Sequence, residues 1–206
     1  MAYPTIDAPY GFRPVNLIGG QEYAGGTRQM AIGSAHGTAI FYGDIVSMSA
    51  SGTVWGTAAI STDSPVQIAG VFLGCSYVNT AGQRIYSQYY PASTTGVVDS
   101  ANAIWAYVAD DPDLVMKVAV VSGTTVMSGN TRAALVGGNV PLVNNIGLTT
   151  TGNSRLAVLS TAATATTLPL KVIDVVTDTT NASGSFTEVL VTWVSGVHMY
   201  RGAAGI

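Results

Sequence analysis

Short strand-like runs separated by turn residues occupy most of this 206-residue chain, and they constrain its fold more than any other feature. The runs are rich in Val, Ile, Thr and aromatic residues, which favour β-strands, whereas Gly, Pro, Asn and Asp lie between them. No stretch carries the apolar period of a helix three turns long, and the sequence shows no repeat of fixed period. The pattern therefore predicts an all-β sandwich or barrel.

Three segments of the sequence also carry residues that predict a particular local structure. In IAGVFLGCSYV (68–78), Gly70 and Gly74 predict bulges or the close approach of another backbone. The motif DDPD (110–113) predicts a turn between two strands, because Pro presets φ and Asp tolerates turn geometry. The least strand-like part of the chain contains segment 131–136, for which we predict one helical turn.

The first 37 residues differ from the rest because glycines and prolines interrupt any regular period. We interpret residues 1–37 as an extended N-terminal arm containing one strand, TRQMAI, and residues 38–206 as the all-β body. The stretch DAPYGFRPV (7–15) is rigid and apolar and has no helical or strand period. Fully extended, the first 15 residues would reach roughly 50 Å, farther than the radius of the domain that carries them.

The arm supplies the expected partner-binding residues, which are Pro9, Tyr10, Phe12, Arg13 and Pro14. Its prolines reduce the conformational entropy that is lost when the arm docks. Tyr, Phe and Arg are residue types suited to interface hot spots. We therefore expect this stretch to lie on a neighbouring molecule.

Charged side chains are scarce and make up 9% of the chain, where about 25% is average. Eight basic and eleven acidic residues would protect the surface of a free monomer poorly against association. We therefore expect a homo-oligomer, with a trimer favoured and a dimer next. The net charge of −3 and the scattered Lys and Arg residues provide no electrostatic basis for binding nucleic acid.

The cysteine count and the N-terminal sequence bear on the cellular compartment. Cys75 is the only cysteine, so no intrachain disulfide can form, and its apolar neighbours predict that it is buried. The first residues lack the basic and apolar regions of a signal peptide, and no window approaches 18 apolar residues. We therefore expect synthesis in the host cytoplasm and no membrane partner.

Motifs for catalysis or cofactor binding do not occur in the sequence. It contains no phosphate-binding loop, no GxGxxG unit opening a helix and no GxSxG elbow. The two histidines lack metal-ligand spacing; we expect His36 in an exposed loop and His198 hydrogen-bonded at a strand end. We therefore expect no enzymatic activity and no cofactor.

Two further groups of residues leave alternatives open. Asp110, Asp111 and Asp113 could hold Ca²⁺ or Mg²⁺ together with backbone carbonyls, but they lack the glycine and distal glutamate of an EF-hand loop. We interpret them as a solvated turn, with a metal site as the weaker alternative. The tyrosines, which are densest in YSQYYP (86–91), suit either a subunit interface or a sugar-binding platform.

Several sequence segments together resemble those of tailed-bacteriophage capsid decoration, or cement, proteins. They are DAPYGFRPV, YGDIV followed by SGTV, IAGVFLGCSYV, AYVADDPDLVMKV, and VIDVV followed by VLVTWVSGVHMYRG. The resemblance lies in the residues of these segments and in their order along the chain, and it covers most of the chain. It implies an all-β jelly-roll or tulip-like domain on the capsid exterior of the virion. Such a domain binds the major capsid protein, often as a trimer or dimer, and locks neighbouring capsid subunits.

Other functions remain open on the sequence alone. A tail-tube subunit would also be all-β with long loops, and a head-fibre protein is a related structural role. A carbohydrate-binding module would use the tyrosines on the virion surface. The major capsid protein would require a long spine helix, which no stretch of the sequence supplies.

Overall fold

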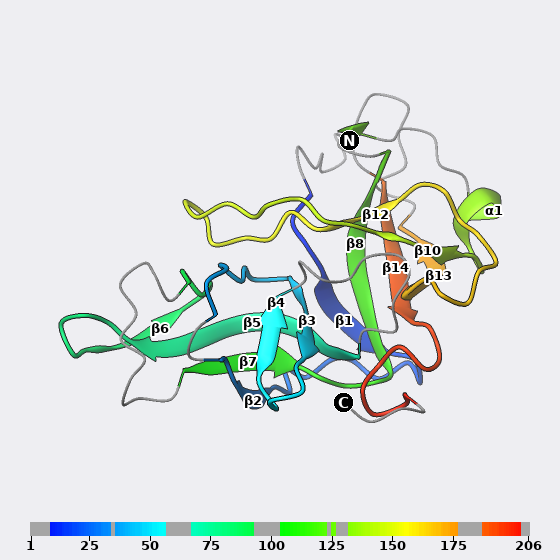
Figure 1. The fold of residues 1–206 in the computed structure, drawn as a ribbon. Helices are drawn as coiled ribbons and strands as arrows, with labels where there is room; N and C mark the ends of the chain where they lie inside the picture. Colours follow the sequence, from blue (N-terminus) through cyan, green and yellow to red (C-terminus); the bar gives the residue numbers. More distant parts are fainter. Residues whose placement is uncertain are drawn as a thin grey trace.

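The computed structural model describes residues 9–33, 36–56, 67–92, 104–122, 125–126, 132–176 and 187–202. Strands dominate the regular structure of these residues, with turns and irregular loops between them, which confirms the predicted all-β fold (Figure 1). The one helix among them is the single turn α1 (Arg132–Leu135), in the segment predicted to be helical. None of the described residues form a helix with the length and apolarity needed to cross a membrane.

Eight strands form the first sheet, namely β1 (Arg13–Leu17), β8 (Leu114–Ser122), β9 (Thr125–Val126), β10 (Asn139–Val140), β11 (Leu142–Val143), β12 (Ala157–Leu159), β13 (Leu170–Val175) and β14 (Glu188–Trp193). Its long strands β8 and β14 stand upright in Figure 1. Their order is β10-β13-β14-β8-β12-β11, and β1 and β9 also pair with β8. β12 runs parallel to β8, whereas β1, β9 and β14 run antiparallel to it. The central strand β8 therefore holds this sheet together.

Six strands form the second sheet, namely β2 (Arg28–Ala31), β3 (Ile45–Met48), β4 (Val54–Gly56), β5 (Ile68–Val78), β6 (Arg84–Ser87) and β7 (Trp105–Ala109). Their order is β2-β7-β5-β3-β4, and β6 also pairs with β5. Ile32, directly after β2, forms a bridge with Val54 of β4. Because β2 and β4 are the two ends of this order, the bridge brings the sheet close to a closed barrel.

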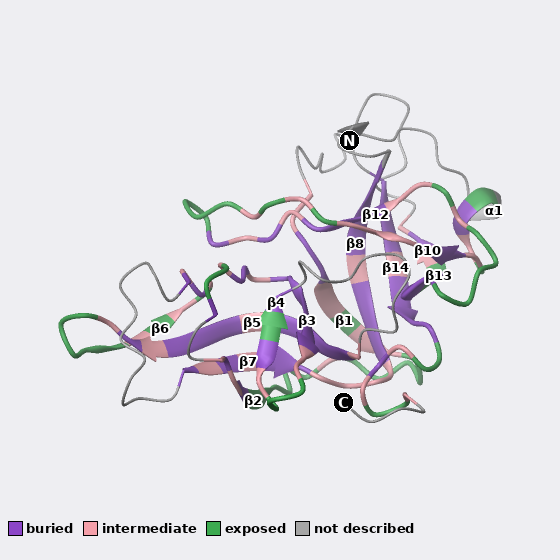
Figure 2. Cartoon of the chain, in the orientation of Figure 1, coloured by how far each residue is buried: buried purple, intermediate pink, exposed green. Residues whose placement is uncertain are grey.

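Strand β5 is buried along most of its length because its two faces belong to different hydrophobic cores (Figure 2). Ile68 and Val71 belong to the core that also contains side chains of β8, β13 and β14. Ala69, Phe72 and Cys75 belong to the core of the second sheet. The predicted burial of Cys75 is therefore confirmed, and the continuous apolar run of β5 reflects burial on both faces.

Bulges lie at the two glycines of β5, as the sequence predicts. The pairing of β5 with β3 shifts register between Ile68 and Gly70, and its pairing with β7 shifts between Phe72 and Gly74. A Cβ atom on Gly70 would lie 2.1 Å from the carbonyl oxygen of Ala109, so this position requires glycine. The bulges explain why residues three apart in β5, rather than two, share one core.

The N-terminal strands correct the predicted arm. β1 pairs with residues 114–117 of β8, and β2 pairs with residues 105–108 of β7. Directly before β1, the backbone N–H of Phe12 donates to the carbonyl oxygen of Gly43 at 2.8 Å. Residues 9–33 thus contribute a strand to each sheet, so the division into an arm (1–37) and a body (38–206) is wrong for them. Residues 1–8 lie outside the described residues.

Candidate functional site

The residues predicted to bind a partner through the arm, Pro9, Tyr10, Phe12, Arg13 and Pro14, pack within their own chain. Phe12 is fully buried, and the other four are partly buried. The ring of Phe12 belongs to the core shared by the two sheets. The prediction that this ring is buried on a partner is therefore wrong, because its own chain already covers it.

The Arg13 guanidinium packs against two tyrosine rings, and these contacts hold the N-terminal segment in place. The Arg13 guanidinium lies 4.1 Å from the ring centre of Tyr42 and 5.5 Å from that of Tyr10, within the range of cation–π contacts. Arg13 also donates to the side-chain oxygen of Asn153 at 3.0 Å. These contacts join β1 to the loop before β3 and to the long β11–β12 connection.

Glu188, the first residue of β14, is buried and receives two partners. The hydroxyl of Tyr10 donates to its carboxylate, and Lys117 Nζ lies 3.1 Å from Oε1. Burial raises the pKa of Tyr10 above its usual value, and the Glu188 carboxylate raises it further, so this hydroxyl stays protonated and donates. The N-terminal segment thus helps to satisfy a buried charge, which would be costly without partners.

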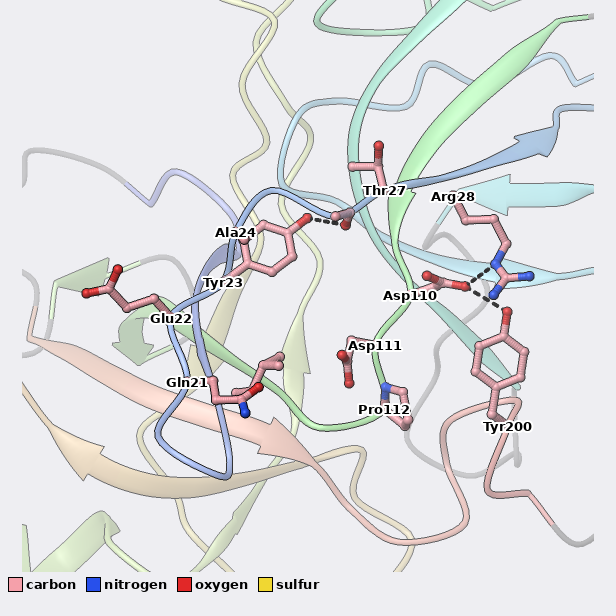
Figure 3. A pocket seen from close by; sticks show the side chains of 12 residues that line it. Gln21, Glu22, Tyr23, Ala24, Thr27, Arg28, Asp110, Asp111, Pro112 and Tyr200 are labelled. Atoms are coloured by element: carbon pink, nitrogen blue, oxygen red, sulfur yellow. Dashed lines mark hydrogen bonds and ion pairs between the residues drawn. The ribbon is translucent and has the colours of Figure 1, made fainter.

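A groove of about 770 Å³ opens where three loops meet (Figure 3). The loops are the β1–β2 connection, the β7–β8 turn and the segment after β14. Its lining includes Gln21, Glu22, Tyr23, Arg28, Asp110, Asp111 and Tyr200. Its volume lies within the range of small-molecule binding sites, so we treat this groove as the candidate site.

The predicted turn at 110–113 is confirmed, and arginines neutralise two of its carboxylates. Asp110 Oδ2 accepts from Arg28 Nε at 2.6 Å and from the Tyr200 hydroxyl at 2.7 Å. Asp113 pairs with Arg201 through both oxygens, at 2.7 and 2.8 Å. The β7–β8 turn is therefore joined to the start of β2 through Arg28 and to the C-terminal segment through Tyr200 and Arg201.

The weaker metal alternative receives no support from this geometry. Asp111 Oδ1 accepts the backbone N–H of Asp113 at 2.8 Å, while the carboxylates of Asp110 and Asp113 are bound to separate arginines. Within the described ranges, no three His, Cys, Asp or Glu side chains converge in a way that could hold a metal ion. The carboxylates of the acidic turn thus join neighbouring segments of the chain at the edge of the groove.

Sequence reasoning missed Tyr23, Arg28 and Tyr200 as groove residues. Arg28 lies 82 positions from Asp110 in sequence, and Tyr200 lies 90 positions from it. No spacing motif can connect residues so far apart. Within this region, only the acidic turn could be recognised as a candidate site from residues close together in the sequence.

The two histidines are both buried, which corrects one prediction. His36 is 4% exposed, with its ring centre 5.3 Å from that of Trp55, so the predicted exposed loop position is wrong. His198 bridges to β5, and its Nδ1 accepts the Tyr200 backbone N–H at 3.3 Å. Burial lowers the pKa of both imidazoles, which favours their neutral forms.

Asp44 is a buried carboxylate directly before β3. Its Oδ2 accepts the backbone N–H of Phe41 at 2.8 Å, and the hydroxyl of Ser154 also bonds to it. Burial raises the pKa of Asp44 from its usual 3.8 to about 6 and outweighs these two hydrogen bonds. In the folded state Asp44 therefore stays protonated up to about pH 6, and above that pH it carries a charge in a site that disfavours charge.

We expect Asp44→Asn to stabilise the chain more at neutral than at acid pH. Because the pKa is raised on folding, the stability contributed by the protonated carboxyl is present at low pH and lost as pH rises through about 6. The variant should therefore gain roughly 5 °C in Tm, relative to the wild type, between about pH 4.5 and about pH 7.5. Thermal unfolding of both proteins at the two pH values checks this. An equal difference in Tm at both would contradict it.

Comparisons with known proteins identify no relative for this site. No family model, curated protein or solved structure matches the chain significantly. The groove and the N-terminal contacts are therefore interpreted from their own residues.

Proposed function

We propose that this chain is a structural protein of a bacteriophage virion, bound to the outside of the head, where it stabilises contacts between capsid subunits. The observation that carries the proposal is a surface with large exposed apolar side chains. Ile146 is 86% exposed and Tyr86 is 72% exposed, and Ile18 and Trp55 are about half exposed. Aromatic and large apolar groups of this kind are typical of surfaces that neighbouring subunits cover.

The distribution of charge supports the same proposal. The chain has eight basic and eleven acidic residues, and among the described residues six of these form three ion pairs, Arg28–Asp110, Lys117–Glu188 and Arg201–Asp113. Few charges therefore remain to keep free molecules apart or to oppose burial at an interface. In an assembled shell, neighbouring subunits cover part of each surface, so a component of the shell tolerates a surface with few charges.

The resemblance to capsid decoration proteins supports the location and the partner. It favours the major capsid protein as the partner and a homo-oligomer, a trimer before a dimer, as the bound form. The proposal assigns the chain no catalytic step, cofactor, nucleic acid or membrane.

Fractionation of purified virions tests this proposal. We expect mass spectrometry to find the chain in isolated heads and not in tails, and mild denaturant to strip it without releasing DNA. Adding the purified protein back to stripped heads should restore their resistance to heat. The same protein, irreversibly denatured before it is added, is the negative control for this restoration.

Other outcomes would favour the alternatives. Recovery of the chain only in the tail fraction would support a tail-tube subunit, and recovery in fibres attached to the head would support a head-fibre protein. Sedimentation at the mass of a single chain over a wide range of concentrations would contradict the oligomer. Absence of the chain from purified particles would overturn the proposal.

A further inference from the structure

The groove at the acidic turn presents two tyrosine rings whose hydroxyls are already bound. The hydroxyl of Tyr23 donates to the carbonyl oxygen of Gly26 at 2.6 Å, and that of Tyr200 donates to Asp110 at 2.7 Å. Tyr23 is partly buried and Tyr200 is about half exposed. These bonds fix the rings, so what they offer to a ligand is apolar ring surface rather than a free hydroxyl. The Arg28 guanidinium lies 5.5 Å from the ring centre of Tyr200, and the exposed half of that side chain remains accessible.

Polar groups of both signs surround these rings. Arg28 is 62% exposed in its side chain and pairs with Asp110 through Nε. Gln21 and Glu22 are exposed on the same loop as Tyr23, and Asp111 lies between this loop and Tyr200 (Figure 3). The groove therefore offers N–H donors from Arg28 and Gln21, and acceptors from Asp111, Glu22 and Gln21.

We propose that this groove binds a neutral saccharide. The C–H face of a sugar ring suits an aromatic face, and each of its hydroxyls both donates and accepts hydrogen bonds, as the mixed lining requires. An anion fits less well, because Arg28 is already paired with Asp110 while Asp111 and Glu22 repel negative charge. A metal ion fits less well too, because no three carboxylates of the described residues converge on one point. The volume of about 770 Å³ accommodates more than one sugar ring.

The inference goes beyond the proposed virion role and does not depend on it. On an assembled shell, many copies of such a site would convert weak individual binding into strong attachment to glycan-coated surfaces. A soluble chain would show only the weak binding of a single open groove. The two properties can therefore be measured separately, one on particles and one on the isolated protein.

A glycan array carrying neutral oligosaccharides of hexoses and N-acetylhexosamines, together with sialylated and sulfated glycans, tests the proposal on the full chain. We expect neutral glycans to bind, with little change when salt is raised, because no net charge is neutralised. Calorimetric titration with the best neutral glycan then gives the affinity of each variant.

The variants separate the rings of the groove from tyrosines elsewhere. Tyr200→Ala should weaken binding about tenfold or more, whereas Tyr200→Phe, which keeps the ring, should change it less than about threefold. Tyr86→Ala removes an exposed tyrosine of β6, outside the groove, and should leave the affinity unchanged. Asp111→Asn, which keeps one acceptor oxygen, should weaken binding without affecting folding.

Several results would overturn the proposal. One is the absence of binding to any neutral glycan on the array. Another is binding restricted to charged glycans that disappears in salt, which would make the groove an electrostatic site. A third is loss of binding in Tyr86→Ala with Tyr200→Ala unaffected, which would move saccharide binding to β6.

Discussion

Replacing Phe12 with alanine should lower the free energy of unfolding by about 3–5 kcal/mol. The side chain is fully buried in the core shared by the two sheets, and its backbone N–H bonds to Gly43. Truncating it leaves a cavity that rigid neighbouring strands cannot fill. Denaturant unfolding should show a lower midpoint with an unchanged slope.

The exposed apolar residue Ile18 provides the control within the same segment. Its side chain is 53% exposed in the loop after β1, so Ile18→Ala should change the free energy of unfolding by less than about 1 kcal/mol. Equal, small effects of both variants would contradict the fold described for the N-terminal segment. They would return Phe12 to the role that its sequence first suggested, a group that docks on another molecule.

The strands could be predicted from the sequence because local chemistry determines them. The apolar run of β5, its two glycine bulges and the turn at 110–113 all depend on residues adjacent in the chain. The same is true of α1, which Gly137 follows with a φ of 86°. In each case, the residue that decides the structure lies within a few positions of the structure itself.

The N-terminal segment could not be predicted because its partners lie far along the chain. Tyr10 is 178 positions from Glu188, and Arg13 is 140 positions from Asn153. Prolines and an irregular pattern correctly excluded a helix, but they do not reveal which strand accepts the segment. An aromatic residue in an irregular segment fills the core of its own chain as readily as that of a neighbour.

The lining of the groove could not be predicted from the sequence either, because its residues also lie far apart along the chain. The sequence singled out Asp110, Asp111 and Asp113 because three carboxylates stand close together. The chemistry of Asp110 depends on Arg28 and Tyr200, and that of Asp113 on Arg201, which the fold brings to the turn from β2 and the C-terminal segment. A paired carboxylate beside a tyrosine ring is a different site from a cluster of free carboxylates, although the local sequence is the same.

Gly70→Ala should lower the free energy of unfolding by about 3 kcal/mol or more. A Cβ atom at this position would lie 2.1 Å from the carbonyl oxygen of Ala109, far inside van der Waals contact, and φ is 152°. Because Ala109 belongs to β7, relief requires β5 and β7 to separate in the middle of the second sheet. Thermal and denaturant unfolding measure the loss.

Two other glycines separate the cost of the contact from the cost of the backbone conformation. Gly82 has a φ of 79° and open space where a Cβ atom would lie, so Gly82→Ala reports backbone strain alone and should cost about 1–2 kcal/mol. Gly19 has open space and no positive φ, so Gly19→Ala should be close to neutral. The order Gly70, Gly82, Gly19 follows if the approach of β7 makes glycine necessary in β5. A Gly70→Ala variant no less stable than Gly82→Ala would show that the two strands can move apart at little cost, and that the bulge is not a fixed point of the fold.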